Sequence, residues 1–182
     1  MRALFASQRH SHAKPGSTFA ESASSNRLFA LRRGMTAPSF MDLALKAAET
    51  AGKSGEVPIG CVIVRDNEVI AVAGNRTLTE RDPTAHAEIL AIRLAAEVIG
   101  SERLVDCDLY VTLEPCTMCA AAISFARVRR LYYGAADPKG GAVESGVRFF
   151  ASPTCHHVPE IYSAVGESEA ATLLREFFKV RR

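Results

Sequence analysis

The fold is decided by residues 109–126, which read LYVTLEPCTMCAAAISFA. The apolar run 109–113 predicts a buried strand, and Pro115 suits the start of a helix because its φ is fixed and it has no N–H group. The segment 116–126 has no charged residue and is rich in alanine. We therefore expect a strand that leads directly into a deeply placed helix, with Cys116 and Cys119 pointing the same way from its first turn.

A second motif, His86-Ala87-Glu88, supplies what the two cysteines lack. His86, Cys116 and Cys119 together offer one imidazole and two thiolates to a tetrahedral zinc ion. A structural zinc site has four protein ligands, whereas a catalytic site keeps one position for water, whose pKa the metal lowers from about 16 to about 7. Glu88 is not needed as a ligand, and we expect it to carry protons.

Each of these motifs taken alone has another interpretation. A Cys-x-x-Cys pair alone also occurs in redox sites and closed zinc sites. A closed site would need a third thiol from Cys61, Cys107 or Cys155, and Cys61 lies in an apolar strand typical of the core. Glu88 could simply complement a helix dipole. The joint pattern favours a catalytic zinc site.

Two helix starts, at His86 and Cys116, are predicted to converge on the metal. Their partial positive ends favour thiolate over thiol and hydroxide over water. The pattern His-x-Glu followed by Pro-Cys-x-x-Cys is that of zinc-dependent deaminases, which hydrolyse an exocyclic amine from a nucleobase. In that reaction Glu88 would take the proton of water, deliver it to the ring nitrogen and later protonate the departing amine.

The rest of the chain alternates between helical and strand patterns, which indicates an α/β layered domain. A capping box at 39–42 begins the first helix, and Gly100 ends the second. The polar loop before Thr84 and the glycine-rich loop 135–146 carry no predicted element. The predicted helices are 39–48, 85–99, 116–126 and 167–182, and the predicted strands are 59–64, 68–73 (paired as a hairpin), 109–113 and 128–133. The helix 85–99 is expected to be mostly buried, and Leu173, Leu174, Phe177 and Phe178 should form the apolar side of the last helix.

The composition changes near residue 36. Residues 1–36 hold six basic residues and one acid, so the remaining 16 basic and 19 acidic residues leave the body at −3. The segment is a disordered basic extension or coding sequence upstream of a true start at Met35 or Met41, and the alternative is an organellar transit peptide. Residues 37–182 then form one catalytic domain.

The cysteine count and the hydropathy bear on the compartment. Five cysteines, two of them assigned to a metal, argue against a secreted disulfide framework. No stretch approaches the ~18 consecutive apolar residues of a membrane span. We expect a cytoplasmic protein, or an organellar one if the leader is a transit peptide. His156 and His157 beside Cys155 could suggest a second metal site, but a polar or RNA-facing loop is favoured.

Residues 38–182 resemble the bacterial tRNA-specific adenosine deaminases, which convert the wobble adenosine of an arginine tRNA anticodon to inosine. The resemblance implies a cytidine-deaminase-like, three-layer α/β/α sandwich around a mixed sheet, one zinc ion per subunit, a homodimer with active sites near the interface, and a tRNA anticodon loop as partner. The matching motifs are EVPIG (56–60), GNR (74–76), DPTAHAEI (82–89), residues 110–119, GAAD (134–137) and FFKVRR (177–182).

Carried over by position, the resemblance makes His86, Cys116 and Cys119 the ligands and Glu88 the proton carrier. Asn75 falls where the family contacts the target nucleoside, and it could equally be a turn residue after Gly74. Asp137 falls where the family approaches the sugar of a neighbouring nucleotide, and it could equally begin a loop. The family often has a basic residue just before this aspartate, where Ala136 stands.

An acidic body must bind RNA through local basic patches. Cations beside aromatic rings suit a splayed anticodon loop, although solvated charges and core phenylalanines would give the same pattern. The candidate contacts are Arg129, Arg130, Phe178, Lys179, Arg181 and Arg182. Two other functions stay open: deamination of a free base or nucleotide such as guanine or cytosine, and a noncatalytic zinc-stabilised RNA-binding module.

Overall fold

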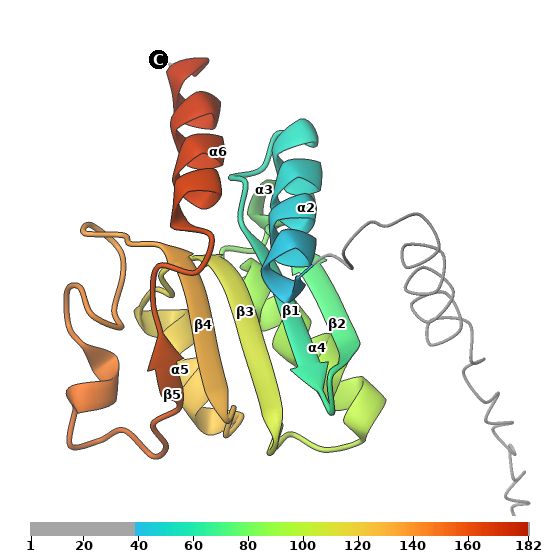
Figure 1. The fold of residues 1–182 in the computed structure, drawn as a ribbon, viewed down its shortest axis with the longest axis vertical. Coiled ribbons are helices and arrows are strands. Elements are labelled where there is room, and N and C mark those ends of the chain that lie inside the picture. Colours follow the sequence, from blue (N-terminus) through green and yellow to red (C-terminus); the bar gives the residue numbers. More distant parts are fainter. Residues whose placement is uncertain (1–38, 182) are drawn as a thin grey trace, which may run out of the picture. The chain divides into compact units, whose positions relative to one another are not determined.

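A five-stranded mixed sheet forms the centre of the computed structural model, which describes residues 39–181. The expectations for residues 1–36 and for Arg182 lie outside this range. The strand order is β2-β1-β3-β4-β5 (Figure 1). The strands are β1 (Gly60–Arg65), β2 (Glu68–Gly74), β3 (Cys107–Leu113), β4 (Arg130–Ala135) and β5 (Glu160–Tyr162). β1 is antiparallel to β2 and β3, and β3, β4 and β5 run parallel.

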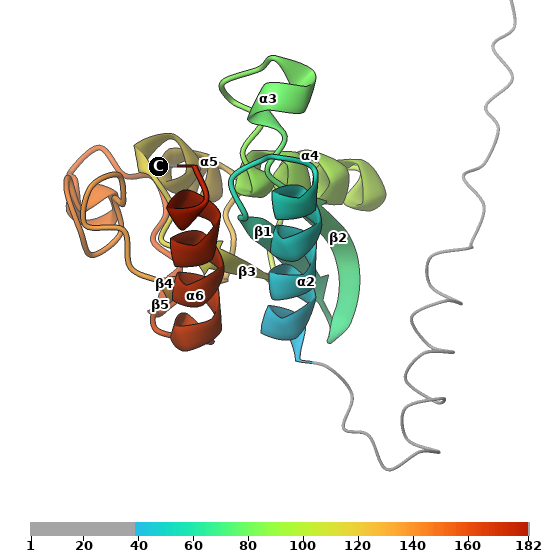
Figure 2. The same cartoon turned by 90° about the horizontal axis from the view of Figure 1, so that it is seen from above.

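Helices cover both faces of the sheet, as the α/β/α prediction requires. α2 (Phe40–Lys53) and α6 (Glu167–Lys179) lie on one face, and α4 (Ala87–Ile99) and α5 (Thr117–Phe125) lie on the other (Figures 1 and 2). β1 shows why both faces need cover. Cys61 and Ile63 enter the core on the α4/α5 side, while Val62 and Val64 pack beneath α2.

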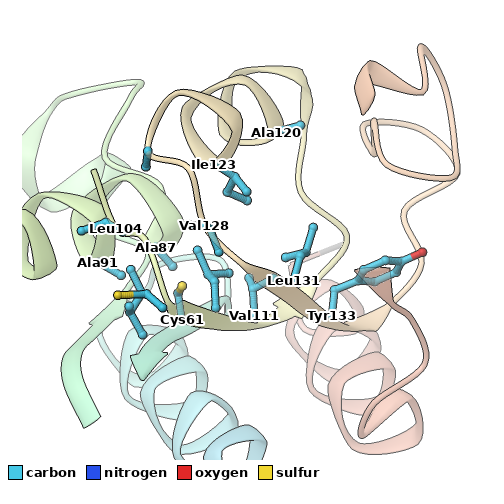
Figure 3. Close-up of a cluster of buried hydrophobic side chains, with 14 of the residues drawn as sticks. Cys61, Ala87, Ala91, Leu104, Val111, Ala120, Ile123, Val128, Leu131 and Tyr133 are labelled. Carbon is cyan, nitrogen blue, oxygen red and sulfur yellow. The ribbon is translucent and has the colours of Figure 1, made fainter. Parts of the chain in front are cut away.

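The larger core lies between the sheet and the α4/α5 layer (Figure 3). The alanines of both helices bring their backbones close to the strands, so that Val111, Leu131 and Ile123 fill the space between them. Within residues 39–181, no helix combines the length and the apolar character that a membrane span requires.

The predicted local signals are found where they were expected. Ser39 caps α2 in a complete capping box with Asp42, with bonds of 2.8 and 3.1 Å. The hairpin 60–74 turns at Asp66 and Asn67, both with positive φ. Gly100 ends α4 in the left-handed conformation.

Four features differ from the sequence prediction. The polar loop before Thr84 contains a short helix, α3 (Thr77–Glu80), and the chain after the glycine-rich loop forms a 3-10 turn (Phe149–Ala151) and β5. α6 ends at Lys179. α4 is less buried than predicted, because Leu94 and Val98 are 43% and 64% exposed. The helix periodicity shows which side chains are apolar, but not which of them another element covers.

Candidate metal centre

The three predicted ligands come together at two helix starts. His86 is the N-cap of α4, Cys116 is the N-cap of α5, and Cys119 lies one turn into α5. Nδ1 of His86 lies 3.7 Å from Sγ of Cys116 and 3.5 Å from Sγ of Cys119. All three donor atoms lie within 4.8 Å of one another.

These separations fit a tetrahedral zinc ion. Zinc–sulfur bonds of about 2.3 Å and zinc–nitrogen bonds of about 2.1 Å place nitrogen and sulfur about 3.6 Å apart at the tetrahedral angle. No other His, Cys, Asp or Glu side chain among residues 39–181 joins the group. A closed site with a third thiol therefore finds no support: Cys61 is fully buried in the core, and Cys155 contacts Ser124 and the carbonyl of His157. Zinc is the cofactor of this His-Cys-Cys site.

The surroundings of the ligands favour a thiolate at Cys116. Hydrogen bonds from Cys119 and then from His86 lower the pKa of Cys116 to about 4. The interaction with Cys116 raises the pKa of both His86 and Cys119. Zinc binding favours thiolates at both cysteines, because the thiolate and not the thiol is the metal ligand.

Glu88 lies in the first turn of α4 beside this group, but it is not one of the ligands. Its side chain is 4% exposed, and it interacts with the Cys119 thiol. Burial raises the pKa of Glu88 above its ordinary value. A buried carboxyl next to the metal ligands can accept and return a proton, which a fully solvated carboxylate does less well at neutral pH.

Asn75 is buried. It lies beside the His86 segment: the N–H of the next residue, Arg76, donates to the carbonyl of Ala85 at 3.0 Å. Its Nδ2 group donates to Oε2 of Glu56 and to Oγ1 of Thr77, each at 3.3 Å. Whether Asn75 contacts a nucleoside stays a prediction, and its observed contacts are those of a structural turn residue.

Glu56 is a buried carboxylate that sequence reasoning used only as part of a motif. It accepts hydrogen bonds from the backbone N–H groups of Leu78 and Thr79, at 3.2 and 2.7 Å, and so caps α3. Burial alone would raise the pKa of Glu56, but the hydrogen bonds outweigh it and the net shift is downward. Glu56 lies 21 residues before the start of α3, so no local sequence signal predicts this helix.

Asp137 stands in the loop after β4. Its Oδ1 atom accepts from the N–H groups of Lys139 and Gly140 at 3.1 and 3.0 Å, which is the turn role expected of a loop starter. Its own N–H group donates to Oε2 of Glu114 at 3.0 Å. An approach to the sugar of RNA stays a prediction.

Glu114 is a buried carboxylate at this site whose role the sequence does not predict. It is 2% exposed and accepts five hydrogen bonds from the segment 137–145. Burial raises its pKa, but bonds from Ser145 and Asp137 outweigh burial and the net shift is downward. A glutamate directly before Pro115 gives no hint of partners more than 20 residues away.

The candidate RNA contacts fall into two groups. Arg129 forms a two-point ion pair with Asp108, at 2.9 and 3.0 Å, and Arg130 pairs with Glu160 at 3.0 Å. Their charges are therefore largely compensated. Lys179 and Arg181 are exposed at the end of α6, and Arg181 stacks on the ring of Phe177, 3.7 Å from its centroid.

Phe177 and Phe178 lie outside both core clusters, so the interpretation of these residues as core phenylalanines is wrong. Phe178 is 48% exposed and Phe177 is half-buried beneath Arg181. In the preceding loop, the ring nitrogen Nε2 of His157 lies 2.7 Å from the carbonyl of Val128, and His156 packs on Phe125. These contacts fit the polar-loop interpretation of the two histidines.

Replacing Cys116 by alanine is expected to remove zinc and stability together, because it deletes a ligand that joins two helix starts. Metal content measured by atomic absorption should fall from one zinc per chain to a small fraction, and Tm should fall with it. Cys155→Ala is the control, because this thiol lies outside the ligand group. Stoichiometric zinc and an unchanged Tm in the Cys116 variant would show that the ligands are others.

Comparisons with known proteins agree with this site. Residues 35–135 match the family described as the cytidine and deoxycytidylate deaminase zinc-binding region. The tRNA-specific adenosine deaminase of Agrobacterium fabrum (strain C58 / ATCC 33970) is 67% identical over 143 residues, which cover 79% of this chain and 94% of that protein. The enzyme of that name from Rickettsia bellii (strain RML369-C) is 51% identical over 138 residues, covering 75% and 95%.

Solved structures give the same result. A structure from a study of A-to-I editing by tRNA:A34 deaminases is 68% identical, with a TM-score of 0.73, and the match covers 74% of this chain and 98% of that one. The guanine deaminase of Bacillus subtilis is 35% identical, with a TM-score of 0.54 and coverage of 81% and 94%. The chain therefore belongs to the zinc-dependent cytidine and deoxycytidylate deaminase family and, within it, to the tRNA-specific adenosine deaminases.

Proposed function

We propose that this protein hydrolyses adenosine to inosine at the wobble position of a tRNA anticodon, with an arginine tRNA as the substrate. The observation that carries the proposal is the juxtaposition of the His86, Cys116 and Cys119 ligand group with the buried carboxyl of Glu88. The 67% identity to a tRNA-specific adenosine deaminase supports the choice of substrate. The reaction consumes one water molecule and releases ammonia.

The bound zinc, Glu88 and the starts of α4 and α5 each contribute to this chemistry. Zinc at such a site lowers the pKa of water, so that hydroxide is available at neutral pH. Glu88 would accept one proton of that water and deliver it to N1 of adenine as the oxygen bonds to C6; it would then move the remaining proton of that oxygen to the amine, so that the C–N bond breaks and ammonia leaves. The starts of α4 and α5 place their partial positive charge at the reacting centre. Asn75 and Asp137 are the side chains proposed to hold the nucleoside and its neighbour.

A free base is the alternative substrate, and one comparison favours it specifically. The guanine deaminase of Bacillus subtilis and this chain have 35% sequence identity. The identity to tRNA-specific enzymes is much higher, and this chain ends in exposed cations beside Phe177 and Phe178 that a free base does not need. A noncatalytic RNA-binding module would leave the position of Glu88 without a purpose.

Changing Glu88 to glutamine should abolish turnover and preserve zinc, because the amide keeps the shape but cannot carry the proton. We expect a fall of about 10²–10⁴-fold in the single-turnover rate. The measurement is sequencing of arginine tRNA for wobble inosine after incubation with pure protein, together with metal content. Glu68→Gln, exposed at the hairpin end of β2, is the matched control.

Two results would contradict the proposal. A Glu88 variant within a few-fold of wild type would remove the proton-carrier role. Efficient turnover of guanine or cytosine by the wild type, with no inosine in tRNA, would instead establish the free-base deaminase.

RNA binding is proposed to depend on the cations at the end of α6. Lys179 and Arg181 are exposed there, Phe178 is half exposed beside them, and Arg182 follows in the sequence. Arg129 and Arg130 are left out, because their ion pairs compensate their charges.

Alanine at Lys179, Arg181 and Arg182 together should weaken binding of an anticodon stem-loop and flatten its salt dependence, with a loss of roughly 0.7–0.9 in the log–log slope per phosphate contact. Turnover at saturating RNA should recover, because the zinc site is intact. The control replaces Arg65 and Arg103, which lie toward the opposite end of β3 from Cys116. Equal salt slopes for wild type and triple variant would refute this RNA contact.

We also propose a homodimer through the α4/α5 layer. The exposed apolar side chains Leu94, Val98 and Phe125 belong to these helices, at 43%, 64% and 62% exposure. His86 and Cys116 begin the same two helices, so a partner on this layer would pack on the elements that carry the active site. All five cysteines are unpaired, which suits a reducing compartment such as the cytoplasm.

Glutamate at both Leu94 and Phe125 should convert the dimer to a monomer, because buried charges without partners oppose association. Sedimentation equilibrium should give twice the chain mass for wild type and the single chain mass for the double variant. Val72→Glu is the control, because Val72 is similarly exposed on the α2 side of the sheet. A wild-type monomer at all concentrations would end this proposal.

A further inference from the structure

Glu114 joins the metal-ligand segment to the loop that carries Asp137. It follows β3 and precedes Pro115 and Cys116, and its carboxylate is almost fully buried. Every hydrogen bond that it accepts comes from the segment 137–145. Oε1 accepts from the N–H groups of Val143 (3.1 Å), Glu144 (2.9 Å) and Ser145 (2.8 Å), and Oε2 accepts from the N–H of Asp137 (3.0 Å) and Oγ of Ser145 (2.8 Å).

Backbone contacts close the same junction from both sides. The N–H of Ala142 donates to the carbonyl of Pro115 at 2.9 Å, and Cys116 forms an isolated antiparallel bridge with Gly141. A Cβ atom on Gly141 would lie 2.5 Å from Oε2 of Glu114 and 2.6 Å from the carbonyl of Asp137. The loop therefore approaches the carboxylate as closely as glycine allows.

We propose that Glu114 is a positioning residue, which sets the place of the 137–145 loop, and with it Asp137, relative to the Cys116 ligand. The inference rests on the proposed function in that Asp137 meets the RNA substrate. A carboxylate suits this task because it only accepts hydrogen bonds, so its two oxygens can satisfy five donors at once. The hydrogen bonds of the carboxylate hold the 137–145 loop, and the chain runs from Glu114 through Pro115 to the ligand Cys116. The position of the loop is thereby linked to that of the ligand.

The substitution Glu114→Gln tests the positioning role, because it changes one carboxylate oxygen and leaves the other in place. One oxygen becomes an NH₂ group, and the fewest donor–donor conflicts arise when this group replaces Oε2, because the Ser145 hydroxyl can rotate to accept. The NH₂ group then faces the N–H of Asp137, so the bond to Asp137 is lost while the three bonds at Oε1 remain. Ser145→Ala is a milder variant that removes only the hydroxyl donor and keeps the carboxylate.

Three readouts separate positioning from general stability. Zinc-loaded Glu114→Gln should keep one zinc per chain, and amide hydrogen exchange in 137–145 should speed up about tenfold or more, as expected for loss of a bond to a charged group. KM for an anticodon stem-loop should rise about fivefold or more, with kcat changed less than KM. Ser145→Ala should shift exchange and KM in the same direction by a smaller factor.

The matched control is Cys107→Ala, which removes a fully buried side chain from the other end of β3. It should lower Tm without changing loop exchange or KM. Loop exchange and KM within twofold of wild type in both Glu114→Gln and Ser145→Ala would overturn the proposal, as would loss of zinc from Glu114→Gln, which would assign Glu114 to support of the ligand. If wild-type protein left the stem-loop unchanged, the proposed function would fail, while hydrogen exchange would still decide whether Glu114 orders the loop.

Discussion

Two helix starts must meet at one metal ion, and the rest of the structure serves this constraint. His86 and Cys116 are the N-caps of α4 and α5, and neither side chain accepts a capping hydrogen bond from its helix. Their orphan N–H groups and aligned dipoles create a positive region that favours anionic sulfur and oxygen. The helices can converge only because the alanine-rich faces of α4 and α5 lie close against one sheet, over strands β1 and β3 that bring the two segments together.

Buried carboxylates hold the loops around this centre. Glu56 caps α3 beside Asn75, and Glu114 gathers the 137–145 loop beside Cys116. A buried carboxylate is unfavourable unless hydrogen bonds replace its hydration, and here each one accepts several. Both carboxylates accept hydrogen bonds from backbone N–H groups and from side chains: Asn75, Thr77 and Thr79 also donate to Glu56, and the Ser145 hydroxyl donates to Glu114. Each loop is therefore shaped jointly by the buried acid and by its own polar residues.

Within the part of the chain that the structure describes, the surface arginines fall into two groups, those paired with carboxylates and those free to meet a substrate. Arg129 and Arg130 lie at the start of β4 and are neutralised by Asp108 and Glu160, so they mainly stabilise the sheet edge. Lys179 and Arg181 form no ion pair with the carboxylates of residues 39–181; they lie together at the end of α6, where Arg181 covers the ring of Phe177. With a body of net −3 from residue 37 onward, such a local concentration of charge is what permits an RNA-binding role.

The α/β class, the four principal helices, the hairpin and the metal ligands were all predictable from the chain alone. These follow from short-range physics: the capping box at Ser39, the period of the apolar residues, and ligand types whose chemistry is specific to zinc. α3, β5 and the roles of Glu56 and Glu114 become visible only in the folded chain, because each depends on a partner about 20 or more residues away that no local sequence pattern identifies. The exposure of Phe178 depends likewise on packing, which the period of apolar residues does not predict. The sequence thus determined which atoms could bind the metal, and the fold decided which acids would order the loops around it.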